Sequence, residues 1–92
     1  MLTAFVLVTT TADRIPEVAQ DIADIPGISE VYSVTGEWNL VAVARVQQHD
    51  ELAGVIADRL SKVDGVVGTN TMIAFRSYGR QDLDAAYALG VE

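Results

Sequence analysis

The chain has no cysteine and only one histidine among its 92 residues. It can therefore form neither disulfides nor thiolate metal sites, and a single histidine cannot supply the ligands of a zinc centre. No nucleophile motif is visible, and the stretch GVVGTN at 65–70 lacks the Lys-Ser/Thr ending of a phosphate-binding loop. The sequence predicts no metal and no bound cofactor.

Basic residues are also few, since six lysines and arginines face 13 acidic residues and the net charge is -7. Affinity for DNA rests largely on lysine and arginine neutralising phosphates, so we expect no direct binding to nucleic acid. No apolar run approaches the roughly 18–20 residues that span a bilayer, and no basic residue precedes the N-terminal apolar stretch as in a signal peptide. We expect a soluble cytoplasmic chain that does not bind membranes.

Half of the residues are hydrophobic, and the length suits one domain. The sequence also repeats itself with a spacing of 38 residues, because IPGISEVYSVT at 25–35 corresponds to VDGVVGTNTMI at 63–73. Gly27 then falls on Gly65, and Ser33 falls on Thr71. Each half is expected to form one supersecondary unit.

Each unit has the pattern strand, helix, strand. Runs rich in β-branched and aromatic residues predict strands at 2–10, 28–35, 38–46 and 66–76. Apolar residues at helical spacing predict helices at 15–25 and 52–63. The order βαββαβ predicts an α+β, ferredoxin-like sandwich, in which two helices cover one face of a four-stranded antiparallel sheet with the first and third strands central.

Both faces of the two central strands are substantially apolar. One face is rich in alanine, which suits closely packed helices, and the other presents Phe5, Leu7, Val41 and Val43. An antiparallel sheet with one wet face normally alternates apolar and polar residues, and large exposed apolar patches usually mark interfaces. We expect these four side chains to form a dimer interface, sheet against sheet; the alternative is that they are simply exposed.

The stretch TGEWNL at 35–40 joins the second and third strands and carries more than a turn requires. Gly36 can adopt the positive φ that hairpin turns often need. Trp38 can seal the sheet end or form an aromatic wall, and Asn39 can bond within the turn or bind a ligand. Short hydroxyl side chains on the flanking strands complete a candidate site for a small polar ligand: Ser33, Thr69 and Thr71.

Two further features have competing interpretations. His49 can act as a general base or ligand, or simply lie near solvent where the second helix starts. The segment 78–92 has no counterpart in the repeat. Leu83, Ala86 and Tyr87 can line one side of a short helix there, or the segment can be a frayed acidic terminus.

The segments SVTGEWNLVAVARV at 33–46 and HDELAGVIADRLSKVDGVVGTNTMIAF at 49–75 resemble the ligand-binding domain of the Lrp/AsnC transcription regulators. This module is also called the RAM domain, for regulation of amino acid metabolism. The most specific features are the glycine-aromatic turn and the Thr-x-Thr of the last strand. We expect a RAM domain at 1–77 and a tail at 78–92, which resembles that of short stand-alone members.

The resemblance implies a dimeric α/β barrel, in which two sheets pack face to face, and often assembly into a higher homo-oligomer. It also implies that amino-acid effectors bind where dimers meet, near the glycine-aromatic turn. This places Gly36, Trp38 and Asn39 at the ligand site, with Thr69 and Thr71 on the adjoining strand.

Two departures from the family pattern bear on function. Full-length regulators carry an N-terminal helix-turn-helix, whereas Met1 here leads directly into the first expected strand. The turn often has Asp where this sequence has Asn39. A carboxylate can pair with an α-ammonium group, and charge-assisted hydrogen bonds are about twice as strong as neutral ones. Amino-acid binding is therefore expected to be weak, altered or absent.

We expect a stand-alone effector-binding and oligomerisation module that senses an amino acid or related metabolite. It would modulate transcription by assembling with itself or with a full-length Lrp/AsnC regulator. One alternative is a purely structural assembly module without a ligand. Another is a small dimeric α/β-barrel enzyme of the monooxygenase kind, which the lack of an acid/base cluster disfavours.

Overall fold

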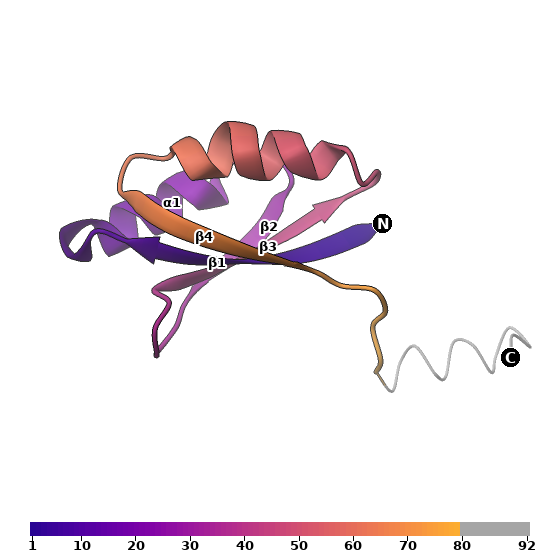
Figure 1. The fold of residues 1–92 in the computed structure, drawn as a ribbon, viewed down its shortest axis with the longest axis horizontal. Helices are drawn as coiled ribbons and strands as arrows, with labels where there is room; N and C mark the ends of the chain where they lie inside the picture. The colour runs from indigo at the N-terminus through magenta and orange to yellow at the C-terminus, as the bar shows by residue number, and fades with distance from the viewer. Residues whose placement is uncertain (80–92) are drawn as a thin grey trace, which may run out of the picture.

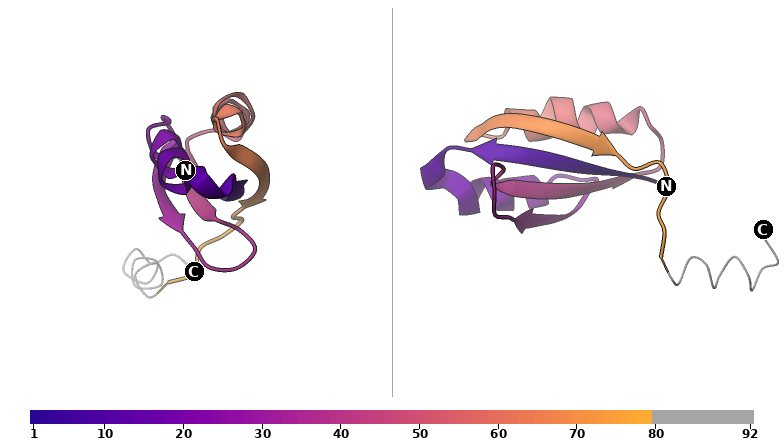
Figure 2. Two further views of the ribbon diagram at one scale, coloured as in Figure 1. Left: turned by 90° about the vertical axis from the view of Figure 1, so that its left-hand side faces the viewer. Right: turned by 60° about the horizontal axis from the view of Figure 1, so that its bottom comes forward.

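Four antiparallel strands form one sheet in the order β2-β3-β1-β4. The computed structural model describes residues 1–79, and Figure 1 shows the sheet with its helices. The strands are β1 (Leu2–Thr10), β2 (Ile28–Ser33), β3 (Leu40–Val46) and β4 (Val66–Ile73). Both helical segments lie on one side of the sheet, as Figure 2 shows. The ferredoxin-like fold, with the first and third strands central, is confirmed.

β1 has the predicted bounds, and the other three strands are shorter than the sequence pattern predicts. The strand expected at 28–35 ends at Ser33, the one expected at 38–46 begins at Leu40, and the last ends at Ile73 instead of 76. After Ile73, Ala74 N–H donates one more backbone hydrogen bond, of 2.9 Å, to the Thr3 carbonyl on β1. The chain then leaves the sheet (Figure 1).

The helical segments occur where the apolar spacing places them, but they are irregular. The first consists of a 3-10 turn, η1 (Ala12–Arg14), followed by α1 (Ile15–Ala23), with Pro16 in its first turn. The missing N–H of proline is tolerated at that position. The second consists of η2 (Ala53–Arg59), which is π-helical, and a 3-10 turn, η3 (Leu60–Lys62). None of the helices in residues 1–79 has the length and apolar character needed to span a bilayer.

The alanine-rich face of the central strands forms the core with the helices. In the register of β1 and β3, Ala4 lies opposite Ala44, and Val8 lies opposite Leu40. These side chains are fully buried. The helical residues packed in the same cluster include Val18, Ile22, Leu52, Val55 and Leu60. The predicted assignment of the helix-covered face is therefore correct.

A glycine after each helical segment allows close packing between the two halves of the repeat. Gly27 and Gly65 both have φ +100, in the region that favours glycine. A Cβ at Gly27 would lie 2.7 Å from Val55 Cγ2, and a Cβ at Gly65 would lie 2.7 Å from Val18 Cγ2. Each half of the chain thus packs its helix on the glycine turn of the other half.

Hydrogen bonds reinforce this exchange between the halves. Arg45 N–H donates to the Gly27 carbonyl at 2.8 Å, and Thr11 N–H donates to the Gly65 carbonyl at 2.9 Å. In both bonds the donor residue and the glycine belong to different halves. The two halves therefore share equivalent contacts as well as a similar sequence.

The predicted division between a domain at 1–77 and a tail at 78–92 stays a prediction. The helix expected to present Leu83, Ala86 and Tyr87 lies outside the described residues.

Two alanine substitutions should separate backbone strain from packing at these turns. Gly36 also has a positive φ, +108, but a Cβ there would meet nothing within 4 Å. Gly36→Ala should cost only backbone strain, about 1–2 kcal/mol. Gly65→Ala should add overpacking against Val18, for a total of about 2–4 kcal/mol. Urea denaturation followed by circular dichroism measures both, and equal losses would contradict the packing role of Gly65.

Candidate functional site

The hairpin between β2 and β3 has the conformation that its glycine predicts. Gly36 lies in it with φ +108 and is exposed. Trp38 and Asn39 follow on the way into β3, and both are half-buried. The turn therefore needs its glycine, while the two residues after it are partly accessible from outside.

The side chain of Asn39 has a structural bond that the sequence did not reveal. Its Oδ1 accepts a hydrogen bond of 2.9 Å from Thr10 N–H at the end of β1. Its backbone N–H donates to the Val8 carbonyl at 2.9 Å, and its own carbonyl accepts from Val34 N–H at 3.1 Å. The side chain of Asn39 thus bonds to the end of β1 rather than within the turn. Its backbone N–H extends the ladder between β1 and β3 by one residue, and its carbonyl closes the hairpin with Val34.

The bond from Thr10 determines which atom of the Asn39 carboxamide is left to face a ligand. A backbone N–H is a donor, so the atom that faces it must be the oxygen. The NH2 group of Asn39 is then the part left for any ligand, and it can only donate. An aspartate at this position would keep one oxygen on Thr10 N–H and offer a second oxygen as an acceptor.

The three hydroxyl side chains of the predicted site do not meet within one chain. Ser33 lies opposite Leu40, Leu40 opposite Val8, and Val8 opposite Thr69, in one row across the sheet. Ser33 is therefore on the β2 edge and Thr69 on the β4 edge, separated by three strand spacings, or roughly 14 Å. Thr71 lies opposite Val6, also on the β4 edge. All three are on the face that the helices cover.

Thr71 instead shares a groove with the only histidine. The groove lies between η2 and β4 and has a volume of about 300 Å³. Its polar lining residues are His49, Asp50 and Thr71, and its apolar lining residues are Leu52, Ala53, Ile56, Ala57 and Ile73. Sequence reasoning did not pair His49 with Thr71, because only the register of the sheet shows that Thr71 faces the second helical segment.

The face of the sheet that the helices do not cover, called the open face below, carries Phe5, Leu7, Val41 and Val43. It is apolar, as predicted, but its residues differ in exposure. Phe5 is 37% exposed, whereas Val43 is only 4% exposed within the single chain. The register adds two side chains that sequence reasoning missed. Met72 lies opposite Phe5, Tyr32 lies opposite Val41, and both are 50% exposed. The predicted dimer interface of Phe5, Leu7, Val41 and Val43 stays a prediction, and Val43 is the least accessible part of it.

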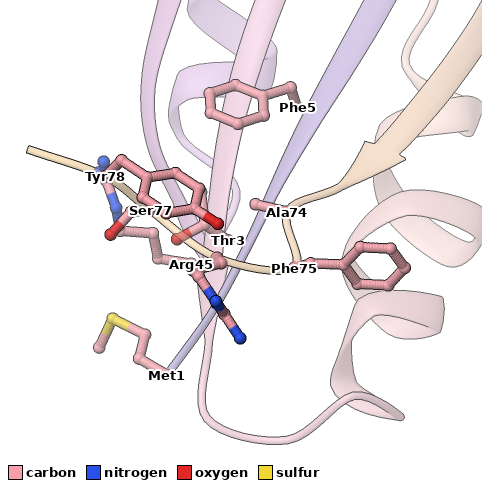
Figure 3. A pocket seen from close by; sticks show the side chains of 9 residues that line it. Met1, Thr3, Phe5, Arg45, Ala74, Phe75, Ser77 and Tyr78 are labelled. Carbon is pink, nitrogen blue, oxygen red and sulfur yellow. The ribbon is translucent and has the colours of Figure 1, made fainter. Parts of the chain in front are cut away.

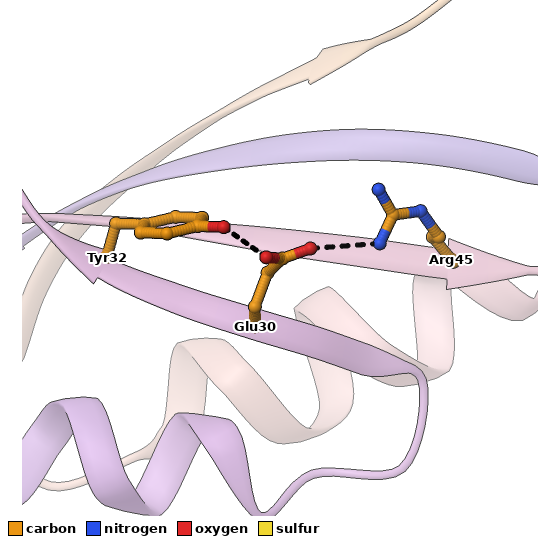
Figure 4. A network of polar contacts seen from close by, with 3 residues as sticks. All are labelled: Glu30, Tyr32 and Arg45. Carbon is orange, nitrogen blue, oxygen red and sulfur yellow. Dashed lines mark hydrogen bonds and ion pairs between the residues drawn. The ribbon is translucent and has the colours of Figure 1, made fainter. Parts of the chain in front are cut away.

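A small polar network borders this open face (Figure 4). Arg45 Nη1 donates to Glu30 Oε1 at 3.1 Å, and the Tyr32 hydroxyl donates to Glu30 Oε2. The bond from Tyr32, followed by that from Arg45, lowers the pKa of Glu30, and the same bond from Tyr32 raises the pKa of Tyr32. The three groups are exposed or partly exposed, so the network orients side chains more than it stabilises the fold.

Arg45 also lines a pocket that is larger than the groove beside η2 (Figure 3). This pocket has a volume of about 530 Å³ and lies between the sheet and the chain that follows β4. Its lining residues are Met1, Thr3, Phe5, Arg45, Ala74, Phe75, Arg76, Ser77 and Tyr78. No sequence argument had singled out this pocket, because Arg45 and Arg76 come together only through the pairing of β1 with both β3 and β4. Within residues 1–79, no three His, Asp or Glu side chains are grouped to hold a metal ion.

Residues 3–83 match the sequence model of the Lrp/AsnC ligand binding domain. A curated relative, an uncharacterized HTH-type transcriptional regulator of Pyrococcus horikoshii, is 40% identical over 76 residues, which cover 79% of this chain and 51% of that protein. The chain spans about half the length of the curated relatives it matches.

Solved structures share the fold. A Thermus thermophilus protein is 41% identical with a TM-score of 0.83, and the match covers 87% of this chain and 100% of that chain. A Neisseria meningitidis transcriptional regulator in complex with L-Met is 18% identical with a TM-score of 0.76, and the match covers 86% of this chain and 53% of that chain. At that identity, the second similarity shows the fold alone.

The structural role of Asn39 predicts different effects for two substitutions. Asn39→Ala should leave the half-buried Thr10 N–H without its acceptor, at a cost of about 1–2 kcal/mol. Asn39→Asp should unfold near the wild-type urea concentration at pH 7, because it keeps the acceptor. Gln47→Ala, at an exposed position outside the sheet, is the control. If Asn39→Ala unfolds at the same urea concentration as Gln47→Ala, the Asn39 bond does not support the fold.

Proposed function

The chain belongs to the Lrp/AsnC ligand-binding domain family, and from this we infer that it is a stand-alone effector-binding and oligomerisation module. It senses an amino acid or related small metabolite and modulates transcription by assembling with itself or with a full-length regulator. The observation that carries this proposal is the match over residues 3–83, which includes every described strand and helix except the first residue of β1, Leu2. The Thermus thermophilus protein, matched over its whole chain, supports a module that folds without a further domain.

The open face supports pairing of two copies, sheet against sheet. It presents Phe5, Leu7 and Val41 together with Tyr32 and Met72, and no helix within residues 1–79 covers it. Leaving these apolar side chains in water costs about 25 cal/mol for each Å² that a partner would bury. A second copy offers the same face, so a symmetric contact satisfies both chains at once.

The arrangement of the hydroxyl side chains supports an effector site between copies. One edge of the sheet carries Ser33 and the hairpin with Trp38, and the other edge carries Thr69 and Thr71. No single chain can close these groups around a small molecule. Two copies that meet edge to edge would place the hairpin of one beside the threonines of the other.

The effector would meet a donor at Asn39 instead of the acceptor that an aspartate supplies. The NH2 group can donate to a carboxylate or carbonyl oxygen of the ligand. Unlike an aspartate, it carries no negative charge that would repel an anionic ligand. A zwitterionic amino acid can use its carboxylate there, but its ammonium group gains no charge partner from this residue. Weak binding of ordinary amino acids by the wild-type chain follows from this.

Calorimetric titration with the twenty amino acids tests the effector site. Wild type should bind its preferred amino acid weakly, and Asn39→Asp should bind a zwitterion about tenfold more tightly, which corresponds to about 1.4 kcal/mol. Trp38→Ala should weaken binding in both backgrounds, and Gln47→Ala, at an exposed position outside the sheet, should not. If no amino acid binds either protein at millimolar concentration, the effector proposal fails and a structural assembly module remains.

Light scattering tests pairing through the open face. Val43→Asp is a poor test because Val43 is already buried in the single chain, so its loss of fold would mimic dissociation. Met72→Glu alters a half-exposed residue of the same face and should convert the dimer to monomer, since an unpaired buried carboxylate costs several kcal/mol. Val67→Glu, at an exposed position on the same strand, should stay dimeric. A monomeric wild type at micromolar concentration would refute the contact.

A further inference from the structure

The chain that follows β4 carries the two most exposed large hydrophobic side chains of residues 1–79. Phe75 is fully exposed and Tyr78 is 82% exposed. Residues 74–79 are called the exit segment below. Single exposed apolar side chains are common on protein surfaces. Two aromatic rings in one short segment beside an apolar sheet face form a patch of the kind that marks an interface.

The exit segment leaves the sheet on the side opposite the helices. Ala74 N–H still bonds to the Thr3 carbonyl of β1 at 2.9 Å, and the chain then turns to the side of the open face (Figure 1 and Figure 2). Together with Thr3, Phe5 and Arg45 of the sheet, it borders the pocket of about 530 Å³ (Figure 3). A partner that covers this end of the open face therefore contacts the exit segment.

We propose that the exit segment of each copy packs against the second copy, so that Phe75 and Tyr78 become buried between the two chains. This inference rests on the proposed pairing through the open face and names a second element of that contact. A symmetric pair uses the same surfaces twice, so each copy both provides an exit segment and receives one. Side chains of the second copy then fill the pocket between the exit segment and the sheet.

The length of the exit segment suits this contact. Packed sheets lie about 10 Å apart. A chain of six residues, such as 74–79, spans up to about 20 Å when it is extended. The exit segment of one copy can therefore reach the sheet of the other without any change in the strands that precede it.

Charge favours a second copy over other partners. The chain has a net charge of -7, and excess charge of one sign drives copies apart. The charged residues that the four strands place on the open face are Glu30 and Arg45, which form an ion pair with each other (Figure 4). The exit segment adds Arg76 and no acidic residue. Pairing thus joins the parts of the two chains that carry none of the excess negative charge.

Serine substitutions test the exit segment without disturbing the core. Phe75→Ser and Tyr78→Ser each remove an exposed ring, so circular dichroism should show an unchanged fold. Sedimentation equilibrium should show dimerisation weakened at least tenfold in both variants. Val67→Ser removes an exposed apolar side chain from β4 and should dimerise like wild type. If all three variants dimerise alike, the exit segment does not contact the second copy.

Met72→Glu separates this failure from failure of the proposed pairing. If Met72→Glu is monomeric while Phe75→Ser and Tyr78→Ser dimerise like wild type, the open face pairs without the exit segment and only the further proposal is overturned. If wild type is monomeric, or if Met72→Glu dimerises like wild type, the pairing itself is refuted and the exit-segment contact with it.

A spin label can locate the contact, because the chain has no cysteine of its own. Arg76→Cys places the label between the two rings and keeps both. In a mixture of spin-labelled copies and 15N-labelled wild type, the label should broaden amide signals of the partner's open face, including that of Phe5. A label at Asp58→Cys, on the exposed side of η2, should not. Broadening confined to the labelled copy itself would mean that the exit segment contacts its own chain, and would overturn the proposal.

Discussion

The fold depends on a reciprocal contact, in which the helix of each half of the repeat rests on the glycine turn of the other half. Val55 packs on Gly27, and Val18 packs on Gly65, at distances that leave no room for a Cβ. Because both helices are held on one face by these contacts, the apolar side chains of the other face have no cover from the described helices. The stability of the core and the open face available to a partner therefore have one cause.

Much of the fold could be predicted because its signals are periodic. Alternation in the central strands identified the helix-covered face, and the repeat identified the two units. The π-helical form of η2 could not be predicted, because apolar residues such as Val55 and Ile56 fit both a 3.6-residue turn and a wider one. Three strands were predicted too long, because a strand stops where its partner ends. The side chains of Ala74 and Phe75 give no indication of where β1 ends.

The candidate site was harder to predict for a reason that lies in the repeat itself. Ser33 and Thr71 occupy equivalent positions in the two halves, and the sequence analysis placed both in one site because of their short hydroxyl side chains. In this topology the equivalent strands β2 and β4 form opposite edges of the sheet, so equivalence in sequence means separation in space. Only an assembly of copies can bring such residues together, which links ligand binding to oligomerisation in the proposed function.

In the proposed function, position 39 joins the stability of the sheet to the choice of ligand. One atom of the side chain must accept the Thr10 N–H, or the end of β1 loses its partner. The remaining atom then decides what a ligand meets: a donor with asparagine, an acceptor with aspartate. Exchange between these two residues changes ligand polarity while keeping the bond to β1, whereas an apolar residue removes both functions. In the proposed effector site, the pairing of Asn39 with Thr10 therefore limits which side chains position 39 can carry without losing the bond to β1.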